Sequence, residues 1–396
     1  MVQKSLLIPL LLLATGYTNT YQYSINITLI NMGDELSPDL NNTPYYYLLN
    51  QNVFPNTTYQ TALLKEVLFD GSPAQFITFE DDDGNPCIRI LTNKTLGKNQ
   101  AAELFITFIL QTSERSFDLS EIGNISQIPK ELSEEYSLKG PWNLSAFPNP
   151  DEILSIARSL KGEDDNALHV LINILSWFEE NMHYNAELTA PQEIWTTFYT
   201  KSGDCDDQAN LFVLFCRALG IPAYVTLGPI YMPGMSKLEE DNNMVFNLTN
   251  VAWHGWAMVY LPTRSGGGGW YPVDLTFFKD AYYEAGHIKS RNLLDHINGS
   301  AFSKWSALEY LSVKSMNYIN ETTTARNEII RSNVTWVETH LILPLGNGTQ
   351  YSKEQTVALL TILILASILL AFVLVLTLLI FRRSRSRQLG EGPSSI

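Results

Sequence analysis

Hydrophobic residues in the first part of the chain recur at every second position, which is typical of strands with one buried face. The segment YQYSINITLI (21–30) alternates in this way, PAQFITFEDDDGNPCIRIL (73–91) has the pattern of strand, turn and strand, and AAELFITFIL (101–110) is a further apolar run. We predict a β-sandwich-like domain over residues 21–148. The acidic turn at 80–85 lacks the spaced ligands and distal Glu of an EF-hand, so we interpret it as a solvated hairpin turn.

At Asn149 the hydrophobic period changes from 2 to 3.6, which predicts helices. Asn149 suits an N-cap, Pro150 the first helical position, and Glu152 the closing residue of a capping box. A second helix is predicted from one apolar face, formed by Leu168, Leu171, Ile172, Leu175, Phe178 and Met182. A third helix is predicted from Cys205 to Gly220.

Strands follow these helices. The runs WAMVYLP (256–262) and WYPVDLTFF (270–278) flank the glycine-rich loop 266–269, which we interpret as a strand connector because no Lys-Ser/Thr pair or following helix marks a phosphate loop. A helical stretch is expected around 288–297, and strand-like runs such as WVETHLILP (336–344) come later. The fold class predicted for residues 149–300 is α+β, with helices packed on an antiparallel sheet.

The two ends of the chain indicate where the protein resides. Residues 1–20 have a charged start, a short apolar run and a polar end, which is the pattern of a secretory signal peptide. Residues 356–381 carry no charge over 26 positions, which at about 1.5 Å per residue cover roughly 39 Å and predict one transmembrane helix. The four arginines at the start of the tail 382–396 predict that this tail lies in the cytoplasm. We therefore interpret residues 301–355, which precede the helix, as a mixed, membrane-proximal extracellular region.

Eleven Asn-x-Ser/Thr sequons support an extracellular location for the body of the chain. All of them precede the predicted membrane helix, and their number suggests a heavily glycosylated surface. The candidate asparagines are Asn26, Asn41, Asn56, Asn93, Asn124, Asn143, Asn247, Asn298, Asn320, Asn333 and Asn347.

Charge and cysteine content narrow the function classes. A formal net charge of -15 repels phosphate backbones, so we expect no nucleic-acid partner. Three cysteines are too few for a disulfide framework. Cys87 and Cys216 suit buried core positions.

Cys205 has the context of a reactive thiol. It stands where a loop gives way to a helix, and the unpaired N–H groups and positive dipole end of a helix N-terminus favour a thiolate and can stabilise an oxyanion. The neighbouring Asp204, Asp206 and Asp207 act in the opposite direction, because their negative charge disfavours ionisation of the sulfur.

A histidine and a carboxylate follow in chain order. His254 precedes the first strand of the predicted hairpin and Asp274 lies near the end of the second, so both come to its open end. There the carboxylate would orient the imidazole, which is the Cys-His-Asp logic of acyl transfer.

Three spans then resemble a known family. GDCDDQANLFVLFCRALGIPAY, HGWAMVYLP and GWYPVDLTF are similar to the three core motifs of the transglutaminase-like superfamily, with matching order and intervals of 49 and 20 residues. The segment WFEENMHYN before them is similar to extracellular members, and the resemblance covers roughly residues 45–300. It implies a papain-like fold, with Cys205 as nucleophile, His254 as general base and acid, and Asp274 as orienting carboxylate.

The resemblance also implies walls around the site and shows two departures. Trp256 and Trp270 match family tryptophans that would exclude water and orient the ring. Met258 stands where many members have Glu, and Leu275 where many have Pro, which affects the expected substrate and loop shape rather than the triad.

The sequence thus predicts a membrane-anchored extracellular cysteine acyltransferase or hydrolase that acts on amide bonds of proteins or peptides. Water as acceptor would make it a protease or amidase, and an amine acceptor would make it a cross-linking enzyme; the pattern does not choose between them. The alternative is a catalytically inert module for cell-surface binding. We expect no cofactor and no metal, and the oligomeric state is left open.

Overall fold

The computed structural model describes residues 18–188, 190–301 and 307–347, which have an α+β fold. Its main feature is a nine-stranded sheet in the order β15-β10-β11-β16-β1-β7-β3-β4, with β12 paired to β11. The strands are β1 (Thr18–Asn31), β3 (Gln60–Phe69), β4 (Ser72–Pro73), β7 (Ala101–Ser113), β10 (Ala223–Asp241), β11 (Met244–Pro262), β12 (Gly268–Val273), β15 (Leu311–Val313) and β16 (Val334–Asn347).

The N-terminal strands do not form the separate β-sandwich-like domain expected over 21–148. β1, β3, β4 and β7 belong to the same sheet as the strands of the second half. A three-stranded sheet of β2 (Asn50–Asn52), β6 (Pro86–Ile90) and β5 (Phe76–Glu80) and the helix α1 (Pro44–Leu49) contribute buried residues to the same core as β1 and β7. Alternation predicted the buried face of these strands but could not predict that their sheet continues through β16 into β11.

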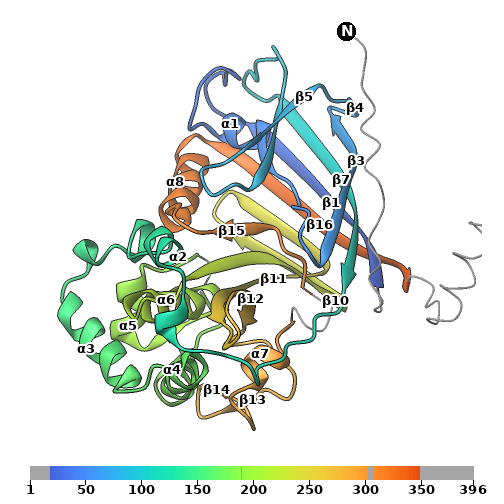
Figure 1. The fold of residues 1–396 in the computed structure, drawn as a ribbon. Helices are drawn as coiled ribbons and strands as arrows, with labels where there is room; N and C mark the ends of the chain where they lie inside the picture. The colour runs from blue at the N-terminus through green and yellow to red at the C-terminus, as the bar shows by residue number, and fades with distance from the viewer. Residues whose placement is uncertain (1–17, 189, 302–306, 348–396) are drawn as a thin grey trace, which may run out of the picture. The chain divides into compact units, whose positions relative to one another are not determined.

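Residues 311–347 complete the fold. The helix α8 (Tyr318–Arg331) lies beside α1, and β16 lies between β1 and β11 in the sheet (Figure 1). β16 pairs with β11 in parallel, from Met244 with Trp336 to Thr249 with Leu341. The described part of the expected membrane-proximal region 301–355 is therefore largely sheet and core.

The second core forms around helices near β11 and β12. Figure 1 shows α3 to α6 gathered beside these strands. The helices are α2 (Lys130–Glu135), α3 (Pro150–Lys161), α4 (Ala167–Asn181), α5 (Ile194–Thr200), α6 (Cys205–Ala218) and α7 (Asp295–Asn298), and the short strands are β8 (His183–Tyr184), β9 (Ser202–Gly203), β13 (Tyr282–Glu284) and β14 (His287–Lys289). α6 is the central helix, because residues 211–216 are 0% exposed.

Several local predictions can be compared with the structure. The helix at Pro150 is confirmed, although the Asn149 side chain makes no cap hydrogen bond. The apolar face of α4 is rotated toward Val170 and Ile174, which are buried while Ile172 is only half-buried. The helical stretch expected at 288–297 is wrong, since the chain there forms β14 and only the short α7.

The acidic turn is a hairpin turn between β5 and β6, but it is not fully solvated. Asp83 is 5% exposed and its carboxylate accepts hydrogen bonds from the backbone N–H groups of Lys314, Ser315 and Met316. Burial raises the pKa of Asp83, but these bonds and one from the Ser315 hydroxyl outweigh it and lower the pKa below its usual value. Asp83 thus fastens the turn to the segment before α8.

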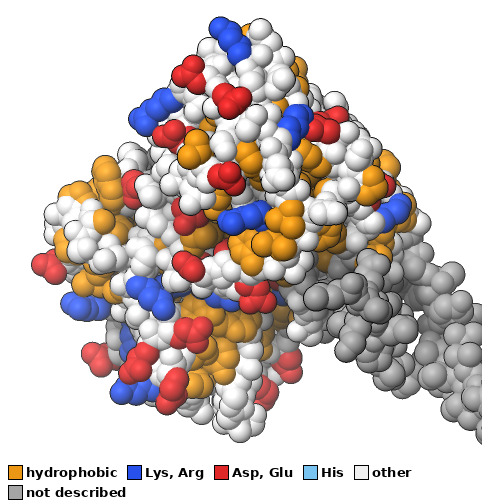
Figure 2. Space-filling model, turned by 90° about the horizontal axis from the view of Figure 1, so that it is seen from above, with side chains coloured by type: hydrophobic (Ala, Val, Ile, Leu, Met, Phe, Trp, Pro, Cys, Tyr) orange, Lys and Arg blue, Asp and Glu red, His pale blue; other side chains and the backbone are white. Residues whose placement is uncertain are grey.

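Acidic and basic side chains are interspersed on the face seen from above, where no large area carries one sign of charge (Figure 2). No helix within residues 18–188, 190–301 and 307–347 is long and apolar enough to cross a membrane. The transmembrane helix expected at 356–381 and the tail 382–396 lie outside the described residues, as does the predicted signal peptide up to residue 17. The strand β1 starts at Thr18, within the last three residues of that predicted peptide.

Candidate active site

Cys205 is the first residue of α6, and the start of this helix is held by buried polar contacts. Asp204 is the extended N-cap residue, and its backbone N–H donates to Asp207 Oδ2 at 3.3 Å. Asp207 is 1% exposed and also accepts from the backbone and side-chain N–H groups of Gln192 at 2.7 and 2.8 Å. The helix therefore begins at a fixed position, with the Cys205 thiol in its first turn.

Gly255 brings β11 against this helix. A Cβ atom at Gly255 would lie 2.7 Å from Asp206 Cβ and 2.9 Å from its Cα, so only glycine allows this approach. The Gly255 N–H group hydrogen-bonds the Cys205 sulfur, which lowers the thiol pKa. Because His254 is the preceding residue, the two proposed reacting side chains come from adjacent backbone segments.

The predicted meeting of His254 and Asp274 is present in the structure. β11 and β12 form an antiparallel hairpin, and at its open end His254 Nε2 lies 2.8 Å from Asp274 Oδ2. The two residues are 6% and 1% exposed. Asp274 Oδ1 accepts the N–H groups of Thr276 and Phe277 at 3.1 and 2.9 Å. With Nε2 engaged by the carboxylate, Nδ1 is the ring nitrogen left for a thiol proton.

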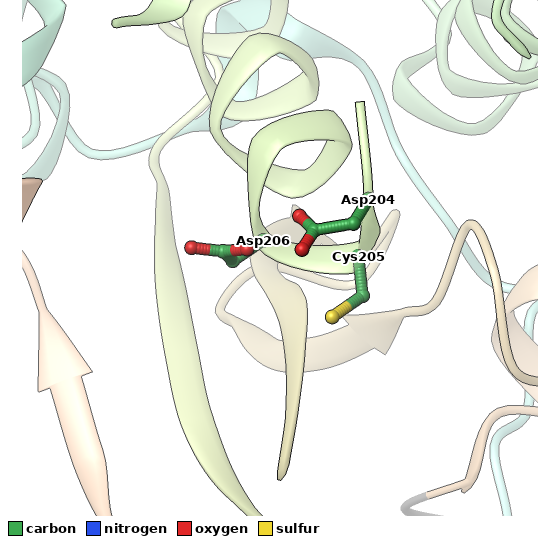
Figure 3. Close-up of side chains that lie close together, drawn as sticks. All are labelled: Asp204, Cys205 and Asp206. Atoms are coloured by element: carbon green, nitrogen blue, oxygen red, sulfur yellow. The ribbon is translucent and has the colours of Figure 1, made fainter. Parts of the chain in front are cut away.

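The charges around Cys205 keep its thiol protonated. Burial raises the thiol pKa well above its ordinary value, and the negative charge of Asp206 raises it further against the opposing Gly255 hydrogen bond. Figure 3 shows the three side chains in the first turn of α6, with the Asp204 carboxyl group pointing toward Asp206. Burial and the neighbouring Asp206 raise the pKa of Asp204 to about 10, so its carboxyl is neutral at physiological pH.

The same three residues are a geometric candidate for metal binding, because their ligand atoms lie within 4.8 Å of one another. The donor set is poor, however. Asp206 Oδ2 already accepts the Tyr318 hydroxyl at 2.8 Å, and the Asp204 carboxyl would have to lose its proton to bind a metal. We assign no metal to these residues, and the expectation that none is required stays a prediction.

The two predicted wall tryptophans occupy different places. Trp256 is 1% exposed and stacks on the His254 ring, with centroids 5.8 Å apart and an interplanar angle of 25°. Trp270 instead packs against Tyr136, Tyr224 and Tyr260, and it pairs with Tyr260 four residues before Asp274 along the chain. Four residues of strand span about 13 Å, so Trp270 is separated from the triad and lines a different cavity of about 560 Å³.

Tyr184 is near the site but was given no role by sequence reasoning. It pairs with Gly203 through the parallel strands β8 and β9, two residues before Cys205. Burial raises its pKa to about 12, and electrostatic repulsion from Cys205 and Asp204 is the next cause, so the Tyr184 hydroxyl lies within electrostatic range of the site. In the sequence, Tyr184 lies in the segment WFEENMHYN. The resemblance to the family drew attention to this segment but assigned no role to any residue in it.

The remaining cysteines and the sequons fit the expectations within the described residues. Cys87 and Cys216 are 6% and 0% exposed, which confirms both as buried. Of the ten sequon asparagines with described side chains, eight are exposed, and Asn26 and Asn247 are half-buried. The Asn347 side chain lies outside the described part. The sequon asparagines that the fold leaves exposed are accessible to glycosylation.

Comparison with known proteins supports the domain and its fold. Residues 154–275, which contain Cys205, His254 and Asp274, match the model of the transglutaminase-like superfamily. This stretch is therefore a transglutaminase-like domain. A comparison with curated protein sequences finds no match.

Two of the solved structures that match this chain come from Cytophaga hutchinsonii and Pseudomonas aeruginosa. A candidate cysteine protease from Cytophaga hutchinsonii matches with 15% identity and a TM-score of 0.50, over 83% of this chain and 91% of that one. The periplasmic domain of TgpA from Pseudomonas aeruginosa matches with 15% identity and a TM-score of 0.30, over 65% and 88%. Of these two, the first supports a shared overall fold.

Proposed function

We propose that this protein is a cysteine acyltransferase or hydrolase that cleaves amide bonds of proteins or peptides through a thioester on Cys205. The observation that carries this proposal is the buried 2.8 Å contact between His254 and Asp274, placed beside a thiol at the start of α6 by the Gly255 contact. The transglutaminase-like domain and the cysteine-protease fold neighbour are consistent with cysteine-based chemistry.

In the proposed first step, His254 Nδ1 takes the Cys205 proton as the sulfur attacks the amide carbonyl carbon. The thiol starts neutral because its pKa is raised, so proton transfer accompanies attack instead of preceding it as a stable ion pair. The N–H groups of the first turn of α6 stabilise the oxyanion. The imidazolium, oriented by Asp274, then protonates the departing amine as the C–N bond breaks and the thioester remains.

The second step determines the class of the reaction. Water activated by His254 releases an acid and regenerates the thiol, whereas a primary amine forms a new amide. The deciding experiment treats full-length protein with a glutamine-containing peptide and a labelled amine. Label incorporation supports transfer, while deamidation or cleavage supports hydrolysis. Cys205→Ala must abolish either product, and Cys87→Ala, which removes a buried thiol elsewhere, must retain it.

We further propose that the enzyme is anchored in the cell membrane by residues 356–381, with residues before that helix outside and residues 382–396 in the cytoplasm. The uncharged run, its basic flank and the eleven sequons support this arrangement. A protease applied to intact cells should digest the catalytic part and spare a C-terminal tag. Enzymatic removal of N-linked glycans should reduce the apparent mass.

A second candidate is an inert cell-surface module with the same fold. The raised pKa of Cys205 favours it, because a thiol surrounded by acidic groups is a poor nucleophile at neutral pH. If Cys205→Ala leaves the cellular phenotype intact and no thioester forms with an activated acyl substrate, the inert module replaces the enzyme as the better description.

A further inference from the structure

His296 lies behind the proposed triad and is bound through both nitrogens of its ring. Nδ1 lies 2.7 Å from the backbone carbonyl oxygen of Asp274, and Nε2 lies 2.9 Å from Glu179 Oε1 on α4. The His296 carbonyl in turn accepts the Asp274 N–H at 2.9 Å. His296 is 1% exposed, so these bonds are shielded from water.

These contacts require a proton on each ring nitrogen. A backbone carbonyl only accepts, so Nδ1 carries a hydrogen. Burial raises the pKa of Glu179, but hydrogen bonds from His296 and Ser290 outweigh it and lower the pKa, so Glu179 is an ionised acceptor. Nε2 therefore also donates, and His296 bridges Asp274 and Glu179 through both ring nitrogens. The Phe278 ring covers it, with centroids 4.2 Å apart.

Asp274 needs such a support because it stands just beyond regular sheet structure. The last pair of the β11–β12 ladder is Ala257 with Val273, so the strand pairing ends one residue earlier. Both backbone groups of Asp274 bond to His296 instead. A shift of this residue would move the carboxylate that His254 contacts.

We propose that His296, oriented by Glu179, is the positioning residue that fixes Asp274 for its contact with His254. The kinetic consequence of this role rests on the proposed amide-bond chemistry at Cys205, whereas the geometric consequence does not. Glu179 lies in α4 and His296 in α7, so the support of the triad comes from two elements that carry none of its members.

Two matched substitutions separate positioning from packing. In His296→Asn the amide N–H lies near the place of Nδ1 and can still donate to the Asp274 carbonyl. In His296→Gln the amide lies near the place of Nε2, reaches Glu179 and leaves Asp274 without its donor. We expect His296→Asn to keep kcat within about threefold of wild type and His296→Gln to lose about 100-fold in kcat with KM unchanged, as a displacement of about 1 Å would cause.

A spectroscopic measurement keeps the test independent of turnover. In full-length protein labelled with ¹⁵N-histidine, which contains six histidines, the His254 Nε2 proton bonded to Asp274 should give a slowly exchanging ring signal. We expect this signal in wild type and His296→Asn but not in His296→Gln. If it is present while wild type shows no catalysis, the proposed function fails and the positioning role stands. Equal loss of signal and thermal stability in both variants would show a packing role and overturn the inference.

The protonation of His296 is tested with Glu179→Gln. The amide can accept from Ser290 and donate to Nε2, so His296 should lose one ring proton while its Nδ1 bond to Asp274 remains. A wild-type spectrum in which His296 already shows a single ring N–H would contradict the assigned pair.

Discussion

Replacing Asp206 with Asn is expected to make Cys205 more reactive. Asp206 is the next residue in the chain and does not belong to the proposed triad. The ligand atoms of the two residues lie within 4.8 Å of each other, and the negative charge of Asp206 is the largest cause after burial of the raised thiol pKa. Asn has nearly the same shape and its amide oxygen can still accept the Tyr318 hydroxyl, so the substitution removes mainly the charge.

The magnitude follows from Coulomb's law. Two unit charges 4.8 Å apart interact by about 0.9 kcal/mol at the dielectric constant of water and by about 3.5 kcal/mol at an effective value of 20. Loss of this repulsion lowers the thiol pKa by about 0.6 to 2.5 units. Intrinsic nucleophilicity falls by roughly half a logarithmic unit per unit of pKa, so the alkylation rate at pH 7 should rise about 2- to 18-fold.

The assay follows carbamidomethylation of Cys205 by mass spectrometry between pH 6 and 10. The rate rises with pH as the thiol ionises, and the rising limb should move to lower pH in Asp206→Asn. Asp39→Asn removes the same charge from an exposed loop and should leave the profile unchanged. An unchanged or slower reaction of Asp206→Asn, in a variant with wild-type thermal stability, would refute the electrostatic reasoning.

Three further predictions concern the support of the site and the fold. Gly255→Ala should separate β11 from α6, destabilise the protein by about 1–3 kcal/mol in urea denaturation and slow any reaction at Cys205, because its Cβ would lie 2.7 Å from that helix. Tyr184→Phe should leave the melting temperature unchanged and slow Cys205 acylation roughly 2- to 10-fold in stopped-flow measurements, because a polar hydroxyl within electrostatic range of Cys205 is lost. Asp83→Asn should lower the free energy of unfolding by about 1.5–3 kcal/mol, whereas Asp82→Asn on the exposed side of the turn should not. The Asp83 contribution should be complete above pH 4 and lost as pH falls through its lowered pKa, so acid titration of wild type and variant should converge.

Local sequence patterns predicted much of the candidate site because its pieces are local. A thiol at a helix start and a hairpin that brings His254 to Asp274 depend on helix caps, strand alternation and a glycine connector, and all of these act over fewer than 25 residues. The sequence also indicated that the aspartates beside Cys205 oppose its ionisation, and the structure gives the same direction.

The parts that sequence reasoning missed depend on contacts between distant segments. Glu179 and His296 are 117 residues apart, and nothing in either local pattern indicates that they contact each other behind Asp274. Asp83 looked like a solvated turn residue because its partners at 314–316 lie more than 230 residues further on. Trp270 matched a family position, but a motif match does not say how far along the strand the ring lies from Asp274.

The placement of β16 connects these observations with the organisation of the chain. β11 carries His254 and Gly255, and its first residues, 244–249, are paired with β16, a strand that begins about 70 residues after β11 ends. β16 contributes Val334, Trp336 and Ile342 to the core that also contains Leu248 of β11. A segment cut at residue 300 would therefore leave residues 244–249 of β11 without a hydrogen-bonding partner on that side and expose apolar side chains. The same strand joins the N-terminal strands to β11, so the geometry of His254 depends on residues from both ends of the described chain. The domain that matches the family model supplies the proposed triad, and the segments on either side of it hold the strand on which His254 lies.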